Sequence, residues 1–412
     1  MSRSESRPET EGRRRRRSLV ALVASWVIWS PFHSMSRPYS QLYMRELGAT
    51  PLAISAISST SVTTLALARI IGGYVADVYG RKEVVWKATM IAAFQYIVYA
   101  LAPSWEMLLL GSLLGSLALF YQPALRSLLA DLTRFESRGR TYALVNFSAS
   151  LLSAVSPSVA AWLISTHGLV GPMRAIYAAS FIAGIVAGII RWRFIEETLG
   201  VRDKVSFLDS YREALRFVKN RLMSLLTIEL LIAASRSLAI LIPYYSVYYL
   251  GVSEANWGYA WTIGLVAGLI VSIPSGYLVD RVGRGASLVL SLILQGAGVL
   301  PLLLALPNSW GAFCAVLLST LFSSIGNSMY FVAMPTMRAD LVPQEKRGRV
   351  ESLVELIADF TRAPLSIVAG AVYEIDPKMP LLASLAVVSV ASLTARFTAS
   401  KLKPYRPGTA SC

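Results

Sequence analysis

Apolar blocks, separated by short polar segments, follow one another along almost the whole chain. Most of them approach or exceed the ~20 apolar residues that an α-helix needs to cross the hydrocarbon core of a bilayer. The pattern therefore predicts an all-α membrane protein with twelve transmembrane helices, and it leaves no room for a sizeable soluble domain. The blocks lie near residues 19–44, 51–78, 84–103, 105–130, 141–166, 171–193, 222–250, 255–279, 286–306, 310–336, 350–373 and 379–399.

The longest polar interruption runs from residue 194 to residue 221, where acidic and basic side chains are interleaved. We interpret it as an amphipathic linker that is partly helical between Phe207 and Val218. It separates six apolar blocks from six, which predicts two six-helix bundles. The predicted organisation is a basic N-terminal tail (1–18), an N-terminal bundle (19–193), the linker (194–221), a C-terminal bundle (222–399) and a C-terminal tail (400–412).

An internal repeat supports the division into two halves. The segment Gly73–Arg81 recurs as Gly276–Arg284, 203 residues later. Two motifs that repeat in one order predict that the halves share one fold, so that the bundles are pseudo-symmetric. Transporters are commonly built from such repeats, with the substrate site near the bilayer midplane. The second motif, an aspartate followed by Arg-Gly-Arg, comprises Asp131, Arg138, Gly139 and Arg140, and then Asp340, Arg347, Gly348 and Arg349.

The first motif has the form Gly-x-x-x-Asp-x-x-Gly-Arg and lies at the end of a predicted span in both copies. Gly73 permits a close approach of helices because it has no side chain. Asp77 places a carboxylate at the membrane edge, where a helix N-terminus or an arginine can contact it. Gly80 permits the tight turn that follows. A plain turn flanked by basic residues is the alternative, but two copies favour a gate that forms and breaks between conformations.

With these motifs the chain resembles the major facilitator superfamily over residues 18 to 400. Gly73 to Lys82 is similar to the family's loop between spans 2 and 3, and Gly276 to Arg284 is similar to a second copy. The resemblance implies a rocker-switch transporter, in which Asp77 contacts the start of span 11 and the loop after span 4. It implies a set of gating residues: Gly73, Asp77, Gly80, Arg81, Lys82, Asp131, Arg138, Gly139, Arg140, Gly276, Asp280, Gly283, Arg284, Asp340, Arg347, Gly348 and Arg349.

The net charge of +15, from 39 basic and 24 acidic residues, does not indicate a nucleic-acid partner, because position explains it. Most basic residues fall on one side of the predicted membrane, whereas Arg45, Arg174 and Lys378 fall on the other. By the positive-inside rule, both termini are then cytoplasmic. The run Arg13–Arg17 would anchor the first span at anionic headgroups. We therefore expect a monomeric, multi-pass protein of the cell membrane.

Ionisable residues inside spans are costly and usually face a cavity or a partner. On one interpretation, the arginines bind an anionic group near the midline, approached by Arg37 and Arg236 from opposite halves, and Asp359 or Glu229 carries a proton. On the other, each acid and base form an internal ion pair that locks packed helices. The candidates for binding substrate or protons are His33 and Arg37 in the first span, Glu229 and Arg236 in the seventh, and Asp359 and Arg362 in the eleventh.

These features together predict a secondary active transporter that works by alternating access, is coupled to protons and exports an organic anion or amphipathic compound. Two positions depart from the family's pattern: Gly111 or Ser112 stands where proton-coupled members often carry arginine, and the antiporter element of span 5 is degraded to Ser156–Ala161. A uniporter or symporter of a neutral metabolite such as a sugar is therefore an alternative. A membrane-embedded enzyme or lipid-handling protein is the alternative from another class.

Composition argues against the enzyme. Only 15% of residues are charged, against about 25% in soluble domains. The chain has two histidines and two cysteines and no Gly-x-x-x-x-Gly-Lys-Ser/Thr loop, so we expect no cofactor, no metal and no ATP-driven pumping. The expected partners are a small-molecule substrate, protons and the lipid bilayer.

Overall fold

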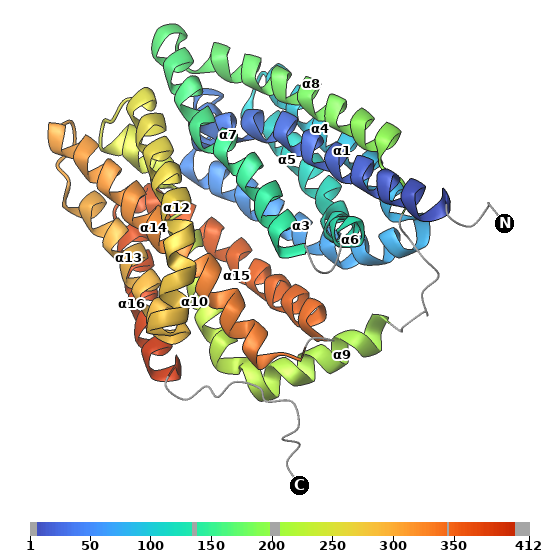
Figure 1. Cartoon of the computed structure of the whole chain (residues 1–412). Helices are drawn as coiled ribbons and strands as arrows, with labels where there is room; N and C mark the ends of the chain where they lie inside the picture. Colours follow the sequence, from blue (N-terminus) through green and yellow to red (C-terminus); the bar gives the residue numbers. More distant parts are fainter. Residues whose placement is uncertain (1–5, 134–137, 198–206, 344–345, 400–412) are drawn as a thin grey trace. The chain divides into compact units, whose positions relative to one another are not determined.

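The computed structural model describes residues 6–133, 138–197, 207–343 and 346–399, and every regular element within these ranges is helical (Figure 1). Most of these segments are apolar, and in lipid a helix satisfies its own backbone hydrogen bonds. The elements are α1 (Ser6–Ser36), η1 (Arg37–Tyr39), α2 (Ser40–Glu46), α3 (Pro51–Tyr79), α4 (Arg81–Leu101), α5 (Trp105–Ala118), η2 (Leu119–Tyr121), α6 (Gln122–Leu132), α7 (Arg138–His167), α8 (Val170–Phe194), α9 (Phe207–Phe217), η4 (Val218–Leu222), α10 (Met223–Leu238), α11 (Ile242–Tyr244), η5 (Tyr245–Tyr249), α12 (Glu254–Val282), α13 (Arg284–Leu304), α14 (Trp310–Leu341), α15 (Arg347–Ile375) and α16 (Met379–Ala399).

Ten helical segments within the described residues are long and apolar enough to span a membrane, and the segment Trp105–Tyr121 is a shorter apolar helix. The 30-residue α7 stands where the fifth span is expected. The expected all-α membrane fold is thus confirmed, whereas the number of twelve spans stays a prediction.

Proline residues interrupt three predicted spans. Proline has no backbone N–H and removes one hydrogen bond from the ladder of a helix, which favours a break, although other prolines, such as Pro274 of α12, lie inside continuous helices. Pro38 lies in η1, where α1 gives way to α2, and Pro123 lies at the start of α6 directly after η2. Pro243 lies in the short α11, after the turn that ends α10. The first of these interruptions places Arg37 at the break between two helices.

Contacts between Cα atoms divide the chain into two compact units. The first comprises residues 1–50 and 60–202, and the second comprises residues 51–59 and 203–412, so the start of α3 belongs to the second unit. The predicted bundle and linker boundaries remain predictions.

The first unit is built around α1, α4 and α8, which pack side by side (Figure 1). α7 packs on α1, and α5 packs on α4. Its apolar core includes Leu22 and Leu128, both fully buried.

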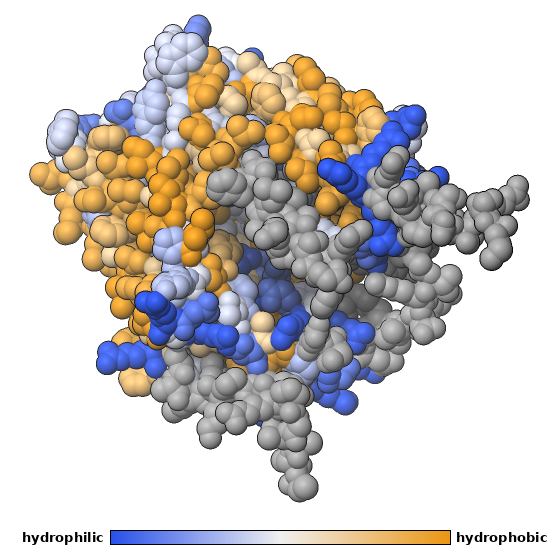
Figure 2. Space-filling model, viewed as in Figure 1, coloured by the Kyte–Doolittle hydropathy of each residue, from blue (hydrophilic) through white to orange (hydrophobic). Residues whose placement is uncertain are grey.

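The second unit packs α14 against α12 and α13, and it packs α10 against α15 and α16. Its apolar core includes Leu288 and Leu292 of α13. Outward-facing positions of its helices are also apolar: Ile270 and Ile273 of α12 are 66% and 77% exposed. In Figure 2 hydrophobic side chains cover the middle of α12 and α13, whereas hydrophilic ones gather near helix ends. Such an apolar surface suits helices in contact with lipid.

Candidate functional site

His33 and Tyr96 form a polar contact within the first unit. Nδ1 of His33 on α1 lies 2.7 Å from the hydroxyl oxygen of Tyr96 on α4. The Tyr96 ring packs edge-on against Trp29 at 6.2 Å, so aromatic contacts fix the phenol that orients the imidazole. His33 is nevertheless exposed, as is Arg37 one turn later. No described residue forms a hydrogen bond or an ion pair with the Arg37 guanidinium.

Arg236 lies at the centre of a polar cluster in the second unit. Its Nη2 donates to Oδ1 of Asn327 on α14 at 2.6 Å and, more weakly, to Oε1 of Gln295 on α13 at 3.4 Å. The guanidinium lies 4.7 Å from the ring centroid of Tyr330, a cation–π distance. Both acceptors are neutral amides, so the charge of Arg236 is solvated within the fold without a carboxylate in contact.

Among the residues that the structure describes, Tyr330 contacts both Glu229 and Arg236. The Tyr330 hydroxyl donates to Oε2 of Glu229 at 2.7 Å, and the ring of Tyr330 forms the cation–π contact with the Arg236 guanidinium. Among the described residues, no nitrogen of a basic side chain lies within 4.0 Å of the Glu229 carboxylate. The internal ion pair considered for Glu229 and Arg236 is therefore not formed in this structure.

Asp359 and Arg362 do form an ion pair on α15. Their side chains, three residues apart, bring Nη1 to 2.5 Å from Oδ1. Asp359 is 2% exposed, whereas 29% of the Arg362 side chain is exposed. For these two residues the geometry favours an internal ion pair that stabilises packed helices over a group that is free to bind substrate or a proton.

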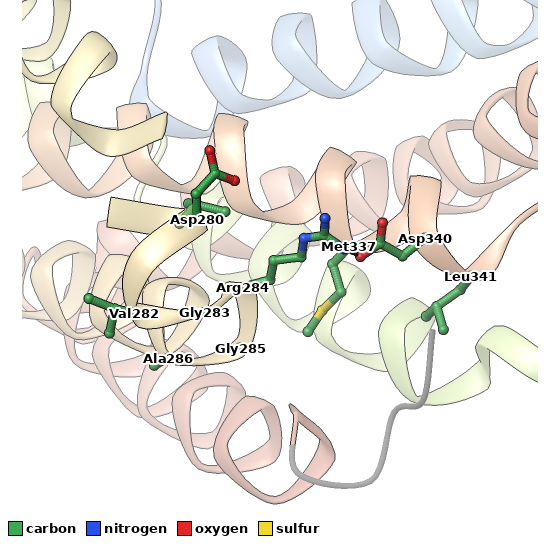
Figure 3. A pocket seen from close by; sticks show the side chains of 10 residues that line it. Asp280, Val282, Gly283, Arg284, Gly285, Ala286, Met337, Asp340 and Leu341 are labelled. Atoms are coloured by element: carbon green, nitrogen blue, oxygen red, sulfur yellow. Dashed lines mark ion pairs between the residues drawn. The ribbon is translucent and has the colours of Figure 1, made fainter. Parts of the chain in front are cut away.

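In each unit an ion pair joins the two repeated motifs. Arg81 pairs with Asp131 in the first unit, and Arg284 pairs with Asp340 in the second. In both units the arginine ends one motif and the aspartate begins the other. Figure 3 shows Arg284 directed at Asp340, whereas the carboxylate of Asp280 points away from this pair. All three residues line a cavity of about 540 Å³.

The glycine before each arginine makes the expected turn. Gly80 and Gly283 have φ angles of +88° and +97°, which favour glycine because other residues are strained there. After Gly80, Glu197 accepts hydrogen bonds from the backbone N–H groups of Arg81 and Lys82, at 3.1 and 3.0 Å. The turn of the first unit is thus tied to the residues that follow α8.

The sequence of this chain matches the profile of a known protein family. The profile of the Major Facilitator Superfamily matches residues 18–234 and 225–410, which is nearly the whole chain. The chain belongs to the Major Facilitator Superfamily. It is a multi-pass membrane transporter that acts on a small molecule.

Individual relatives of this superfamily member are distant. An uncharacterised transporter of Methanocaldococcus jannaschii is 24% identical over 331 residues, which cover 77% of this chain and 81% of the relative. The crystal structure of the human organic anion transporter has a TM-score of 0.65 at 16% identity, covering 92% of this chain and 99% of that one. The nucleoside transporter NupG has a TM-score of 0.70 at 14% identity, covering 95% and 100%. At these identities the solved structures establish the fold alone.

The internal repeat of this superfamily member also relates the two mid-span clusters. The 203-residue shift that aligns the Gly-x-x-x-Asp motifs aligns His33 with Arg236. Each of these residues contacts the third long helix of its unit, His33 through Tyr96 on α4 and Arg236 through Gln295 on α13. The same helix position thus carries a polar residue in both halves.

Several residues that contact the candidate site residues, or are buried and polar, were not evident from the sequence. Tyr96, Gln295, Asn327 and Tyr330 carry no motif, although a glutamine or an asparagine inside an apolar block is itself unusual. Arg191 of α8 is 1% exposed and donates to the Ser25 and Thr89 hydroxyls at 2.9 and 2.6 Å, although the sequence placed it near a span end.

The structure describes only some of the remaining residues that the sequence analysis proposed for the gate. Arg347 donates to the carbonyl oxygens of Val342 and Ala339, at 3.1 and 2.7 Å, and Nη1 of Arg349 lies 4.0 Å from Glu213. A Cβ at Gly276 would meet nothing within 4 Å, so no described neighbour requires glycine there. The side chains of Asp77, Arg138 and Arg140, and the surroundings of Gly73 and Gly139, lie outside the described residues.

Proposed function

We propose that this chain is a proton-coupled secondary transporter that exports an organic anion or amphipathic compound by alternating access. Two arginines support the anionic substrate. Neither Arg37 nor Arg236 has a carboxylate within 4.0 Å among the described residues, and Arg236 is held by neutral amides. A charged group inside a span costs at least about 2.5 kcal/mol when it is not compensated. An anionic substrate would supply the missing charge, and arginine suits carboxylate or phosphate groups.

Glu229 is the better proton carrier of the two candidate carboxylates. Its described partner is the neutral hydroxyl of Tyr330, whereas Asp359 contacts Arg362 at 2.5 Å. Protonation of Asp359 would break an ion pair, but protonation of Glu229 would change only a hydrogen bond. The Tyr330 ring also contacts the Arg236 guanidinium. A change of the Tyr330–Glu229 hydrogen bond on protonation would therefore affect the position of the guanidinium proposed to bind substrate.

The pairs Arg81–Asp131 and Arg284–Asp340 would act at the gate. Each joins the two motifs within one unit and so holds the turn between two helices in one geometry. We place both termini in the cytoplasm, the protein in the cell membrane and the functional unit in a monomer, in keeping with the distribution of basic residues.

Transport into proteoliposomes, with and without a proton gradient, tests this function. A panel of organic anions, nucleosides and sugars is first screened for thermal stabilisation of the purified protein, and the strongest compound is used as the probe. Glu229→Gln should lose gradient-driven accumulation but retain exchange of the probe across the membrane, because exchange needs no net proton movement. Gradient-driven accumulation at the wild-type rate in this variant would refute Glu229 as the carrier.

A neutral, hydroxyl-rich metabolite is the second candidate substrate. Gln295, Asn327 and Tyr330 provide amide and hydroxyl groups of the kind that bind such compounds. Stabilisation by sugars or nucleosides, with no response to anions, would favour this candidate. In that case the role of Arg236 would be to orient the side-chain amides of Gln295 and Asn327 through its hydrogen bonds.

A further inference from the structure

The helix α9 continues without a break through the π-helical turn η4 into the span that begins with α10. The residues that flank the turn, Phe217 and Met223, both have right-handed helical backbone angles. A π-turn contains more residues than an α-turn, so it slows the rotation of successive side chains around the helix axis. Side chains four residues apart therefore stay aligned here, and the helix has one buried side and one exposed side.

The buried side of this helix packs within the second unit. Ala214, Val218 and Leu222 follow one another at four-residue steps, and all three belong to the apolar core of that unit. Glu213, beside them, reaches the start of α15, where its Oε1 lies 2.6 Å from Nζ of Lys346. Apolar packing and an ion pair thus fix how α9 is turned about its own axis, and they determine which side chains face outward.

The outward side combines basic and apolar side chains. Arg216 and Lys219 are exposed, and neither forms an ion pair or a hydrogen bond with a described residue. Leu215 and Met223 are each 51% exposed. We call these four residues the basic side of the linker helix. Exposed lysine or arginine beside large apolar side chains is typical of helices that lie at a membrane surface.

The basic side leads to the side of α10 that faces away from the candidate substrate residues. Consecutive residues of an α-helix are turned by about 100°, so residues two or nine apart lie on nearly opposite sides. Thr227 is exposed and comes two residues before Glu229 and nine before Arg236. Met223 lies about one turn before Thr227 and shares its side. The basic side therefore continues into the part of the span that would contact lipid.

Position and charge together favour negatively charged lipid headgroups as the partner. Basic clusters directly outside a span attract anionic lipids, and the long basic side chains extend their charged ends to the headgroups. Between residues 212 and 223 the chain has four basic residues and one acidic residue, Glu213, which already pairs with Lys346. We propose that the basic side binds anionic phospholipid headgroups at the membrane surface. It contains none of the residues assigned to substrate or protons, so its test is separate from that of transport.

Quenching of a fluorophore by nitroxide-labelled lipids tests this binding in the full chain. Asn220, exposed beside Lys219, is replaced by cysteine in a chain that also carries Cys314→Ala and Cys412→Ser, and is then labelled. The protein is reconstituted in phosphatidylcholine nanodiscs. Phosphatidylglycerol or phosphatidylcholine, each with the nitroxide at the same acyl-chain position, is added in increasing proportion.

The proportion of labelled lipid that gives half-maximal quenching reports the preference for charge. A basic residue beside anionic headgroups raises affinity roughly fivefold, so this proportion should be at least about fivefold lower for phosphatidylglycerol. Equal proportions for the two lipids would show that the helix meets the bilayer without selecting charge, and would overturn the proposal. Quenching by neither lipid would show that protein covers this side, which would also overturn it.

Two double variants locate the binding. Arg216→Gln with Lys219→Gln should raise the half-quenching proportion of phosphatidylglycerol to that of phosphatidylcholine. Arg193→Gln with Arg396→Gln removes the same charge from exposed residues near the ends of α8 and α16. Because salt screens distant exposed charges, this control should change the proportion less than about twofold. Equal changes in the two double variants would indicate a diffuse effect of net charge and would overturn the assignment to the basic side.

Discussion

Replacement of Arg236 by glutamine is the most direct test of an anionic substrate. Arg236 donates to Asn327 at 2.6 Å and lies 4.7 Å from the Tyr330 ring centroid. Glutamine can still donate to Asn327, but it cannot supply a positive charge. A hydrogen bond to a charged group contributes about 1.5–3 kcal/mol, and each 1.4 kcal/mol is tenfold in affinity. The affinity for an anionic substrate should therefore fall about tenfold to a hundredfold.

The same change should have little effect on folding. The cation–π contact with Tyr330 is worth about 1–2 kcal/mol, and the retained amide offsets part of its loss. Arg396→Gln on α16 is the matched control, since Arg396 is exposed and contacts none of the cluster. Arg236→Lys should give an intermediate affinity, because lysine keeps the charge but not the planar fork.

The assay is counterflow of the anion that most stabilises the wild type, measured in proteoliposomes over a range of concentrations, with Tm as the folding control. Arg236→Gln should raise the half-saturating concentration at nearly unchanged Tm. If its half-saturating concentration equals that of Arg396→Gln, Arg236 does not contact the substrate charge, and the reasoning from its missing carboxylate is wrong.

Further variants probe the gate and the buried pair. Arg284→Asp should slow transport, and the added change Asp340→Arg should restore part of the rate; no recovery in the double variant would argue against the ion pair as a gate element. Gly80→Ala should lower the Tm more than Gly283→Ala, because both positions have positive φ but only at Gly80 would the new Cβ lie 2.6 Å from a carboxylate oxygen, that of Glu197; equal shifts would contradict this. Asp359→Asn should reduce the free energy of unfolding by about 2 kcal/mol, measured by denaturant unfolding. This is less than for a fully buried pair because 29% of the Arg362 side chain is exposed. A loss of less than about 0.5 kcal/mol would show that the ion pair does not stabilise the packed helices.

The sequence was informative where a signal is local or repeated. Apolar blocks identify spans because lipid imposes their length, and the three-residue spacing of Asp359 and Arg362 already places them on one helix face. The breaks after α1 and α10 were not predicted, because prolines lie both at such breaks, as Pro38 does, and inside continuous helices, as Pro274 of α12 does. Positive φ at Gly80 and Gly283 follows from the turn that the motif requires.

Contacts between distant segments could not be predicted in the same way. The pairing of Arg81 with Asp131 depends on how α4 packs against α6, which no local pattern specifies. Likewise, seven residues separate Glu229 from Arg236, and only the tertiary fold brings the Tyr330 side chain of α14 into contact with both. The charged residues within spans can be read from the sequence, but which neutral side chains contact them depends on tertiary packing.

The two halves have kept their helix-end chemistry and diverged at mid-span. Arg81–Asp131 and Arg284–Asp340 are the same ion pair formed from the same two motifs. By contrast, the equivalent positions His33 and Arg236 carry an imidazole that can be neutral and a guanidinium that is always charged. A gate that works in both halves requires matching chemistry in each, whereas a site for an asymmetric molecule requires different groups on its two sides. Matching helix ends and differing mid-span groups are therefore what a transporter of a polar, asymmetric substrate would need, and on this reasoning we expect variants of the mid-span clusters to change which molecule is carried and variants of the ion pairs at the helix ends to change only the rate.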